Sequence, residues 1–466
     1  MSTRILTSLF IAILMLFFTV SLFLIPMTPE HGYYAAIAKF MAQGMVPYKD
    51  FFTMEMPVGI GLYGLLYSFV GVEASSNFSL VPFVIINVVN LLLLWRLMTR
   101  LSIKGGTAFI GLLFYFLLCY SSDGLHMNME ILASTFMLAA FLAMLKRKGV
   151  YTLLAAFLFS LAVGCESQVI VMFPVVMIAA TKSKSNKLDF KQIAMLVANS
   201  ALFLFAGYVI IAYSCGNTEW RENITWEIER APDYAATRIK SIVSYLVIQS
   251  VRCGVIFLLF ALFLYKKLHA HGRRMTLVAA VATVCCFGLM FFNVEVAQGL
   301  LLYPFMTIAL MHIVQAVSKK WIAAILAVVL MTPPAALSVR EWMKFGDGEL
   351  RRLQNEEMSF IKESLKKPGK AVMLIDTDKE FFIGPQIFAE CPHVQPVHIG
   401  SGSMGYKNGF YENENFMANI GSADYIIIND AAFTGLVIGK YADAFGEKIE
   451  KMKSSGTQSI MIYEEE

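Results

Sequence analysis

The chain has 466 residues, of which 57% are hydrophobic and 15% charged, and its formal net charge is +4. Because a soluble globular domain carries roughly 25% charged residues, this composition excludes an ordinary soluble protein and predicts a membrane protein. The mild positive charge is spread over short Lys/Arg clusters, which favours membrane-flanking loops over a nucleic-acid-binding surface. The seven cysteines form no CxxC motif, so we predict small core residues rather than a disulfide framework.

The first apolar segment, residues 5–25, follows Arg4 and is longer than the apolar core of a signal peptide. We predict that it is retained as a transmembrane helix, since a span needs about 20 mostly apolar residues. Further candidate spans, which bring the total to eleven, lie at 78–98, 106–121, 130–146, 150–165, 167–181, 192–214, 246–265, 275–292, 299–317 and 320–338.

The loops between these segments alternate in charge. Every second loop is rich in Lys and Arg, as at 146–148 and 182–191, whereas the intervening loops carry most of the acidic residues. Cytoplasmic loops are enriched in Lys and Arg. We therefore predict a protein of the bacterial inner or plasma membrane with a cytoplasmic N-terminus. Its C-terminus and its acidic loops, where we place the active site, then lie on the extracytoplasmic side.

The stretch 28–66, directly after the first span, contains Glu30, Asp50 and Glu55. Thr28 suits a helix N-cap and Gly44 a helix end, which predicts a helix too short to span the membrane between them. We expect this helix to lie along the membrane surface. A second short apolar helix is predicted over 58–72.

After about residue 339 the chain becomes more polar. We predict an amphipathic helix over 346–367, strands over 370–376, 394–399, 424–429 and 459–464, and a further helix over 434–454. The predicted fold is an all-α polytopic membrane domain with juxtamembrane helices, residues 1–340, followed by a small extracytoplasmic α/β domain, residues 341–466.

The stretch 28–66 resembles the first external loop of the polytopic C-type glycosyltransferase superfamily. The match consists of Glu30 just after the first span, a Tyr-rich helix, the sequence PYKDFF over 47–52, and a Pro-containing apolar helix. It is similar in particular to the protein mannosyltransferase and aminoarabinose transferase branch and its bacterial kin. Glu55 also matches, but Met56 replaces a lysine and Val58 the second proline of the pattern. Residues 126–144 and 299–310, with Glu130 and Tyr303, resemble later segments of the family.

The resemblance implies transfer of a sugar, with inversion, from a polyprenyl-phosphate carrier to an acceptor hydroxyl of a glycan, lipid or protein in the cell envelope. Such a reaction needs a general base near the hydroxyl and positive groups near the departing phosphate. The resemblance makes Glu30 the base, with Asp50, Glu55, Glu130 and Tyr303 as substrate-binding residues.

Arg252 is the candidate phosphate ligand, because an arginine within an apolar run is costly and points to function. The residues also allow simpler interpretations. A carboxylate at the position of Glu30 favours the helix dipole, Arg252 can extend to lipid headgroups, and Asp50 and Glu55 suit ordinary solvated loops.

A divalent cation is a further candidate, since Mg²⁺ and Mn²⁺ prefer oxygen ligands. Glu130 and the nearby His126 are the predicted ligands. A lone loop histidine often has no special role, and the loop carboxylates suit a base with orienting groups equally well.

Two other functions remain open. A transporter or flippase for a lipid-linked saccharide would often show repeated halves and charges near the bilayer midplane, but we find no such repeat, and the acidic residues gather at one surface. A non-catalytic surface protein would use its outer α/β domain to bind a partner.

Overall fold

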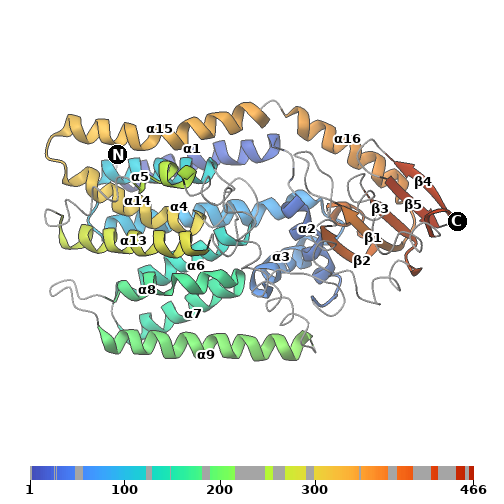
Figure 1. The fold of residues 1–466 in the computed structure, drawn as a ribbon, viewed down its shortest axis with the longest axis horizontal. Helices are drawn as coiled ribbons and strands as arrows, with labels where there is room; N and C mark the ends of the chain where they lie inside the picture. The colour runs from blue at the N-terminus through green and yellow to red at the C-terminus, as the bar shows by residue number, and fades with distance from the viewer. Residues whose placement is uncertain are drawn as a thin grey trace.

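The computed structural model describes residues 3–25, 27, 29–47, 56–121, 128–146, 148–180, 189–215, 247–255, 268–289, 299–345, 348–375, 386–401, 421–428, 448–456 and 461–465. Long helices run side by side at one end of the molecule, and a small sheet stands at the other (Figure 1). The predicted fold class, a polytopic helical protein with a small C-terminal α/β part, is confirmed.

Within the described residues, six helices are long and apolar enough to cross a membrane. They are α1 (Thr3–Leu24), α4 (Leu80–Arg100), α9 (Phe190–Cys215), α13 (Ala270–Leu289), α14 (Gly299–Ala316) and α15 (Lys320–Phe345). The shorter apolar helices are α5 (Gly105–Tyr120), α6 (Met129–Met144), α7 (Gly149–Cys165) and the pair η3 (Ser167–Met172) and α8 (Phe173–Ile178). Each falls on a predicted span, whereas the predicted span at 246–265 is described only over 247–255.

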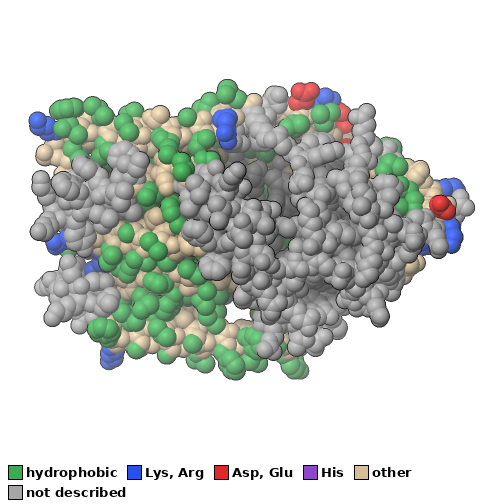
Figure 2. Space-filling model, viewed as in Figure 1, with side chains coloured by type: hydrophobic (Ala, Val, Ile, Leu, Met, Phe, Trp, Pro, Cys, Tyr) green, Lys and Arg blue, Asp and Glu red, His purple; other side chains and the backbone are tan. Residues whose placement is uncertain are grey.

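The interior of the bundle is apolar, and so is much of its outside. Helix α14 is buried along almost its whole length, including Phe305, which packs edge-on against Phe141 of α6. By contrast, α9 exposes Leu202, Phe205 and Tyr213. Figure 2 shows hydrophobic side chains along the sides of the long helices. An apolar exterior of this extent is expected where a helix bundle faces lipid rather than water.

The first loop, residues 26–79, contains two short helices, α2 (Pro29–Ala42) and α3 (Pro57–Val70), and the 3₁₀ turn η1 (Ser76–Ser79). Both predicted short helices are thus confirmed. Gly44, just beyond α2, has a φ of +89°, which a glycine adopts without steric cost. The rings of Tyr34 and Tyr63 stack 6.1 Å apart and join α2 to α3. Figure 1 shows both helices between the bundle and the sheet.

The C-terminal segment, residues 349–465, begins with α16 (Glu349–Ser364), the predicted amphipathic helix. Its sheet has the order β2-β1-β3-β5-β4. The strands β1 (Gly369–Ile375), β2 (Val394–Ser401) and β3 (Tyr425–Ile428) are parallel, and β5 (Met461–Glu465) and β4 (Met452–Gly456) pair antiparallel. All four predicted strands are present. The predicted division at 340/341 lies within α15 and stays a prediction.

Two elements of this segment differ from the predictions. The helix predicted over 434–454 is wrong at its end, because Met452–Gly456 forms edge strand β4, and residues 434–447 lie outside the described residues. This strand reads MKSSG and lacks an apolar alternation, so only its pairing with β5 makes it a strand. The short helix α17 (Gln386–Glu390) was not predicted, because five residues are too few for a helical period to be visible.

Candidate active site

Glu130 is a buried carboxylate in the first turn of α6, with 7% of its surface exposed. The side chain of Asn128 caps this helix, and its Oδ1 accepts a 3.0 Å hydrogen bond from the backbone N–H of Ile131. The first turn of a helix favours a negative charge because unpaired N–H groups point toward it. Acidic side chains are rarely this buried in proteins unless they are paired or functional, so Glu130 marks this end of α6 as a candidate site.

The start of α3 packs directly against this end of α6. A Cβ added to Gly59 would overlap the sulfur of Met129, and one added to Gly164 of α7 would lie 2.5 Å from Cγ2 of Val58. The glycines at these two positions therefore let α3 approach α6 and α7 closely. As a result, the first loop lies against the turn that carries Glu130.

A second group of site residues meets at the start of α14. Tyr303 is fully buried, and its hydroxyl donates a 3.1 Å hydrogen bond to Oε1 of Gln249. Residues 247–252 are helical, so Gln249 and Arg252 lie one turn apart on the same side of that helix. Arg252 is also buried, with 6% of its surface exposed. The structure therefore brings the turn carrying Arg252 to Tyr303.

Helices α6 and α14 are joined beside these residues. Ser134, one turn after Glu130, donates a 3.4 Å hydrogen bond to the backbone carbonyl of Leu300, one turn before Tyr303. The elements carrying Glu130, Tyr303 and Arg252 thus form one connected group at the end of the bundle nearest the first loop. Three of the predicted site residues, separated widely in sequence, come from elements that α14 connects, since it bonds both to α6 and to the turn of Arg252.

Glu30 occupies the second position of α2, as predicted, but its side chain lies outside the described part of the structure. The next residue, His31, is buried, and its Nε2 lies 2.6 Å from Oγ of Ser79. Because the Ser79 hydroxyl donates its hydrogen to the carbonyl of Ser76, the imidazole must supply the proton of the His31–Ser79 bond. The first turn of α2 is therefore tied to η1.

Three predicted site residues, Asp50, Glu55 and His126, lie outside the described residues. Among the residues that are described, no group of three or more His, Cys, Asp or Glu side chains is placed to hold a metal ion. Glu130 is the only predicted cation ligand whose surroundings are described, so the cation site stays a prediction.

Sequence reasoning missed two residues that shape this site. Gln249 is an uncharged side chain in an apolar run, and only its buried bond to Tyr303 reveals a role. Gly299 begins α14, and a Cβ there would lie 2.7 Å from the hydroxyl oxygen of Tyr303. A polar residue within an apolar span was the available signal for Gln249, whereas no local pattern distinguishes Gly299.

Comparison with solved structures relates this arrangement to a known fold. ArnT from Cupriavidus metallidurans, in a crystal structure bound to undecaprenyl phosphate, superposes with a TM-score of 0.65 at 10% identity, covering 99% of this chain and 98% of that one. The chain has the ArnT fold. The apo state of ArnT gives a TM-score of 0.59 at 10% identity over 98% of this chain and 97% of ArnT.

The arabinosyltransferase EmbB from Mycobacterium smegmatis is a more distant neighbour, with a TM-score of 0.44 at 14% identity over 67% of this chain and 31% of EmbB. No family model matches the sequence, and no curated protein matches it significantly. The resemblance that we infer from the first loop is thus confirmed at the level of the ArnT fold, which extends over nearly the whole chain.

Proposed function

We propose that this protein is a membrane glycosyltransferase of the C type. It would transfer a sugar from a polyprenyl-phosphate carrier to an acceptor hydroxyl. The observation that carries the proposal is the ArnT fold over nearly the full chain, in a structure whose ArnT counterpart holds undecaprenyl phosphate. The connected group of Glu130, Tyr303 and Arg252 at one end of the bundle supports it, because a carrier phosphate needs a buried cation and an acceptor needs orienting polar groups.

In the proposed reaction the acceptor oxygen attacks the anomeric carbon of the donor sugar as the bond from that carbon to the phosphate oxygen breaks. The carboxylate of Glu30 takes the proton of the acceptor hydroxyl, and the electron pair of the broken bond leaves on the polyprenyl phosphate. Attack opposite the leaving group inverts the anomeric centre. A positioned base contributes typically 10²–10⁴-fold to such a step.

Arg252 would hold the phosphate oxygens, because its guanidinium is always charged and presents several N–H donors in a fixed plane. Its burial strengthens that interaction, since opposite charges attract more strongly where water is excluded. Tyr303 and Gln249 fix the adjacent helix turn. Glu130, together with Asp50 and Glu55, would orient the acceptor.

We further propose that the sheet end of the molecule is extracytoplasmic. Figure 2 shows Lys and Arg side chains at the end of the bundle opposite the sheet. That end includes Arg100, Lys104, Lys146 and Lys148, which flank α4 to α7. Cytoplasmic flanks of membrane helices are enriched in such residues. The sheet and the first loop lie at the other end, where a polyprenyl-phosphate sugar would be used.

The test is consumption of polyprenyl-phosphate sugars by the purified protein in detergent, where transport cannot occur. We expect at least one donor, from a panel of polyprenyl-phosphate pentoses and hexoses, to transfer its sugar to an acceptor. Glu30→Gln should lower the rate by 10²-fold or more. The matched control Glu356→Gln alters an exposed residue of α16 that pairs with Arg352, and it should retain the wild-type rate.

Near wild-type transfer by Glu30→Gln would remove Glu30 as the base. If no donor is consumed in detergent but a lipid-linked saccharide crosses reconstituted vesicles, the protein is a flippase. The stereochemistry of the product tests inversion separately, because retention would require a covalent or two-step route.

A further inference from the structure

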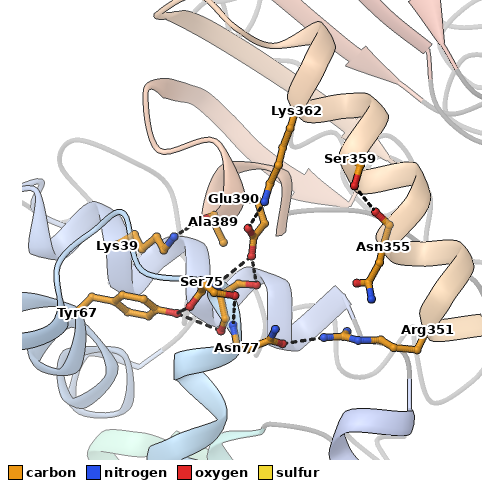
Figure 3. A network of polar contacts seen from close by, with 11 residues as sticks. Lys39, Tyr67, Ser75, Asn77, Arg351, Asn355, Ser359, Lys362, Ala389 and Glu390 are labelled. Carbon is orange, nitrogen blue, oxygen red and sulfur yellow. Dashed lines mark hydrogen bonds and ion pairs between the residues drawn. The ribbon is translucent and has the colours of Figure 1, made fainter. Parts of the chain in front are cut away.

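A buried lysine joins the first loop to the C-terminal segment. Lys39 of α2 has 1% of its surface exposed, and its ammonium group donates a hydrogen bond to the backbone carbonyl of Ala389 in α17. The same nitrogen lies 5.4 Å from the centre of the Tyr67 ring. A positive charge is rarely buried without such compensation. The contact therefore ties the fourth turn of α2 to the carboxyl end of α17 (Figure 3).

The next residue of α17, Glu390, binds the turn that follows α3. Its Oε1 accepts a 2.9 Å hydrogen bond from the backbone N–H of Ser76 and a second from the Ser76 hydroxyl. Its Oε2 pairs with Nζ of Lys362 in α16 at 2.6 Å. Both carboxylate oxygens are thus engaged, one with the first loop and one with the C-terminal segment (Figure 3).

From Ser76 a relay of hydrogen bonds leads back to the candidate base. The Ser79 hydroxyl donates to the Ser76 carbonyl at 2.6 Å, and His31 Nε2 donates to the Ser79 oxygen at 2.6 Å. His31 is the neighbour of Glu30 in the first turn of α2. Three successive contacts therefore connect Glu390 with the turn that carries Glu30.

Other contacts hold the same two parts together. Arg351 donates to Oδ1 of Asn77 at 2.7 Å (Figure 3), and Gln43 donates to the carbonyl of Pro392 at 2.9 Å. Gln354 makes a reciprocal pair of 2.8 Å bonds with the backbone of Met27. Most of these bonds end on backbone groups. A side chain that binds backbone N–H and C=O groups fixes where a loop lies, whereas a purely apolar contact would allow it to slide.

From these contacts we infer that Glu390 and Lys39 are positioning residues. Through them the C-terminal segment holds the first loop, and with it Glu30, in the reactive position. We call the contacts of Lys39 and Glu390 with the other part the clamp. This inference rests on the proposed function for its catalytic part, whereas the clamp itself can be tested without any sugar transfer. None of the described contacts of the clamp involves the turn of Arg252, so the inference predicts an effect on the rate of the chemical step rather than on donor binding.

Steady-state kinetics of the full-length protein test whether the clamp affects catalysis. A displacement of about 1 Å at a reacting group can cost on the order of 100-fold in rate. We therefore expect Glu390→Ala and Ser79→Ala each to lower kcat by roughly 10- to 100-fold, while KM for the donor stays within about twofold. The Glu390→Ala, Ser79→Ala double variant should be no slower than the slower single variant, because both break one relay.

The matched controls are Glu464→Ala and Ser68→Ala. Glu464 pairs with Lys367 at the sheet, and the Ser68 hydroxyl bonds within α3, so both should retain wild-type kcat. Should Glu390→Ala fail to fold, Glu390→Gln keeps the acceptor for Ser76 and loses only the ion pair. A rise in donor KM at unchanged kcat, or effects that multiply in the double variant, would overturn the positioning role.

Labelling of Cys391 tests the clamp independently. This thiol lies next to Glu390, is buried, and burial raises its pKa to about 11. Maleimide should therefore react slowly in the docked protein. We expect labelling of Cys391, quantified by peptide mass spectrometry, to accelerate at least tenfold in Lys39→Met and Glu390→Ala. The control Lys367→Met removes an exposed lysine of the same segment and should leave the rate unchanged.

The two experiments separate the two proposals. If the wild-type protein consumes no donor but Cys391 labelling accelerates in the variants, the proposed function fails and the clamp stands. If the wild-type protein is active but labelling and kcat are both unaffected by Lys39→Met and Glu390→Ala, the clamp fails and the proposed function stands.

Discussion

The Tyr303 hydroxyl donates a hydrogen bond to Oε1 of Gln249, 54 positions earlier in the chain, at 3.1 Å. The bond lies in the buried part of the bundle and connects α14 to the helical turn that also carries Arg252. Since Cys253 Sγ lies 3.7 Å from the same Gln249 oxygen, the amide is held from two sides. Its orientation in turn fixes the turn on which the proposed phosphate ligand stands.

Removal of this bond should weaken donor binding. Tyr303→Phe keeps the ring and deletes the hydroxyl, leaving the Gln249 amide oxygen with a weaker partner. A net hydrogen bond contributes about 0.5–1.5 kcal/mol, so we expect KM for the polyprenyl-phosphate sugar to rise by roughly 2- to 10-fold. Steady-state kinetics over a range of donor concentrations measures this. Tyr151→Phe, on α7 beside Lys146, is the control and should bind donor as the wild type does. An unchanged donor KM in Tyr303→Phe would separate Tyr303 from the donor site.

Gly299→Ala should act through the same tyrosine. The added Cβ would lie 2.7 Å from Tyr303 Oη and 3.0 Å from Cζ, so the ring must move away from Gln249. We expect a donor KM raised in the same direction as in Tyr303→Phe, and a double variant whose effect is smaller than the product of the two. Gly288→Ala, in α13 with no atom within 4 Å of the added Cβ, is the control. Multiplicative effects would show that Gly299 acts elsewhere.

Glu130→Gln should reduce transfer without unfolding the protein. The amide keeps the shape of the side chain but removes the negative charge beside the α6 N-terminus. The helix loses about 0.3–1 kcal/mol of dipole stabilisation, which predicts a melting temperature within a few degrees of the wild type. The sugar-transfer rate should fall on the order of 10-fold or more if Glu130 orients the acceptor. A fall in melting temperature large enough to account for the lost transfer rate would assign Glu130 a purely structural role.

The contact between Glu390 and the first loop should weaken in acid. Burial alone would raise the pKa of Glu390, but the hydrogen bonds from Lys362 and Ser76 outweigh it and hold the pKa below its ordinary value. The folded protein therefore binds its proton less tightly than the unfolded chain does. The stabilisation is present above the ordinary glutamate pKa of about 4.3 and is lost as the pH falls through the lowered pKa.

The measurement is the difference in melting temperature between the wild type and Glu390→Gln from pH 7 down to pH 3. We expect this difference to be constant above about pH 5 and to shrink below about pH 4.3. The cations that face Glu390 are Lys362, Lys39 and Arg351. A difference that grows toward acid would mean that the pKa of Glu390 is raised.

The lysine of the clamp also favours the folded state more as the pH rises, but it does so in the alkaline range. Burial lowers the pKa of Lys39, and the nearby Glu390 carboxylate only partly opposes this. The unfolded chain therefore holds that proton more tightly than the folded protein does. Burial of the protonated lysine lowers the free energy of unfolding, and this penalty disappears as the pH rises from the lowered pKa toward about 10.4. We expect Lys39→Met to lose more stability relative to the wild type at pH 9 than at pH 6. Denaturant titrations at both values measure this, with Lys367→Met as the control.

The sequence by itself determined the membrane class, the positions of the apolar helices, the two short helices of the first loop and most strands of the sheet. Each of these depends on local patterns, because the length of an apolar run, a Pro–Gly pair or an alternation is visible within about twenty residues. Local chemistry also identified Arg252 as unusual, since a charge in an apolar run is costly wherever the run folds, whereas Glu130 came from the family resemblance.

Only the tertiary structure decided which of these residues meet. The bond from Tyr303 to Gln249 and the contacts of Lys39 and Glu390 join residues 54 to 350 positions apart. Such pairings follow from how whole helices pack, and no periodicity reports them. Strand β4 and helix α17 likewise owe their form to neighbours rather than to their own sequences. The stretch around Glu30 thus takes its helix from its own residues, and its anchorage to the C-terminal segment from the fold.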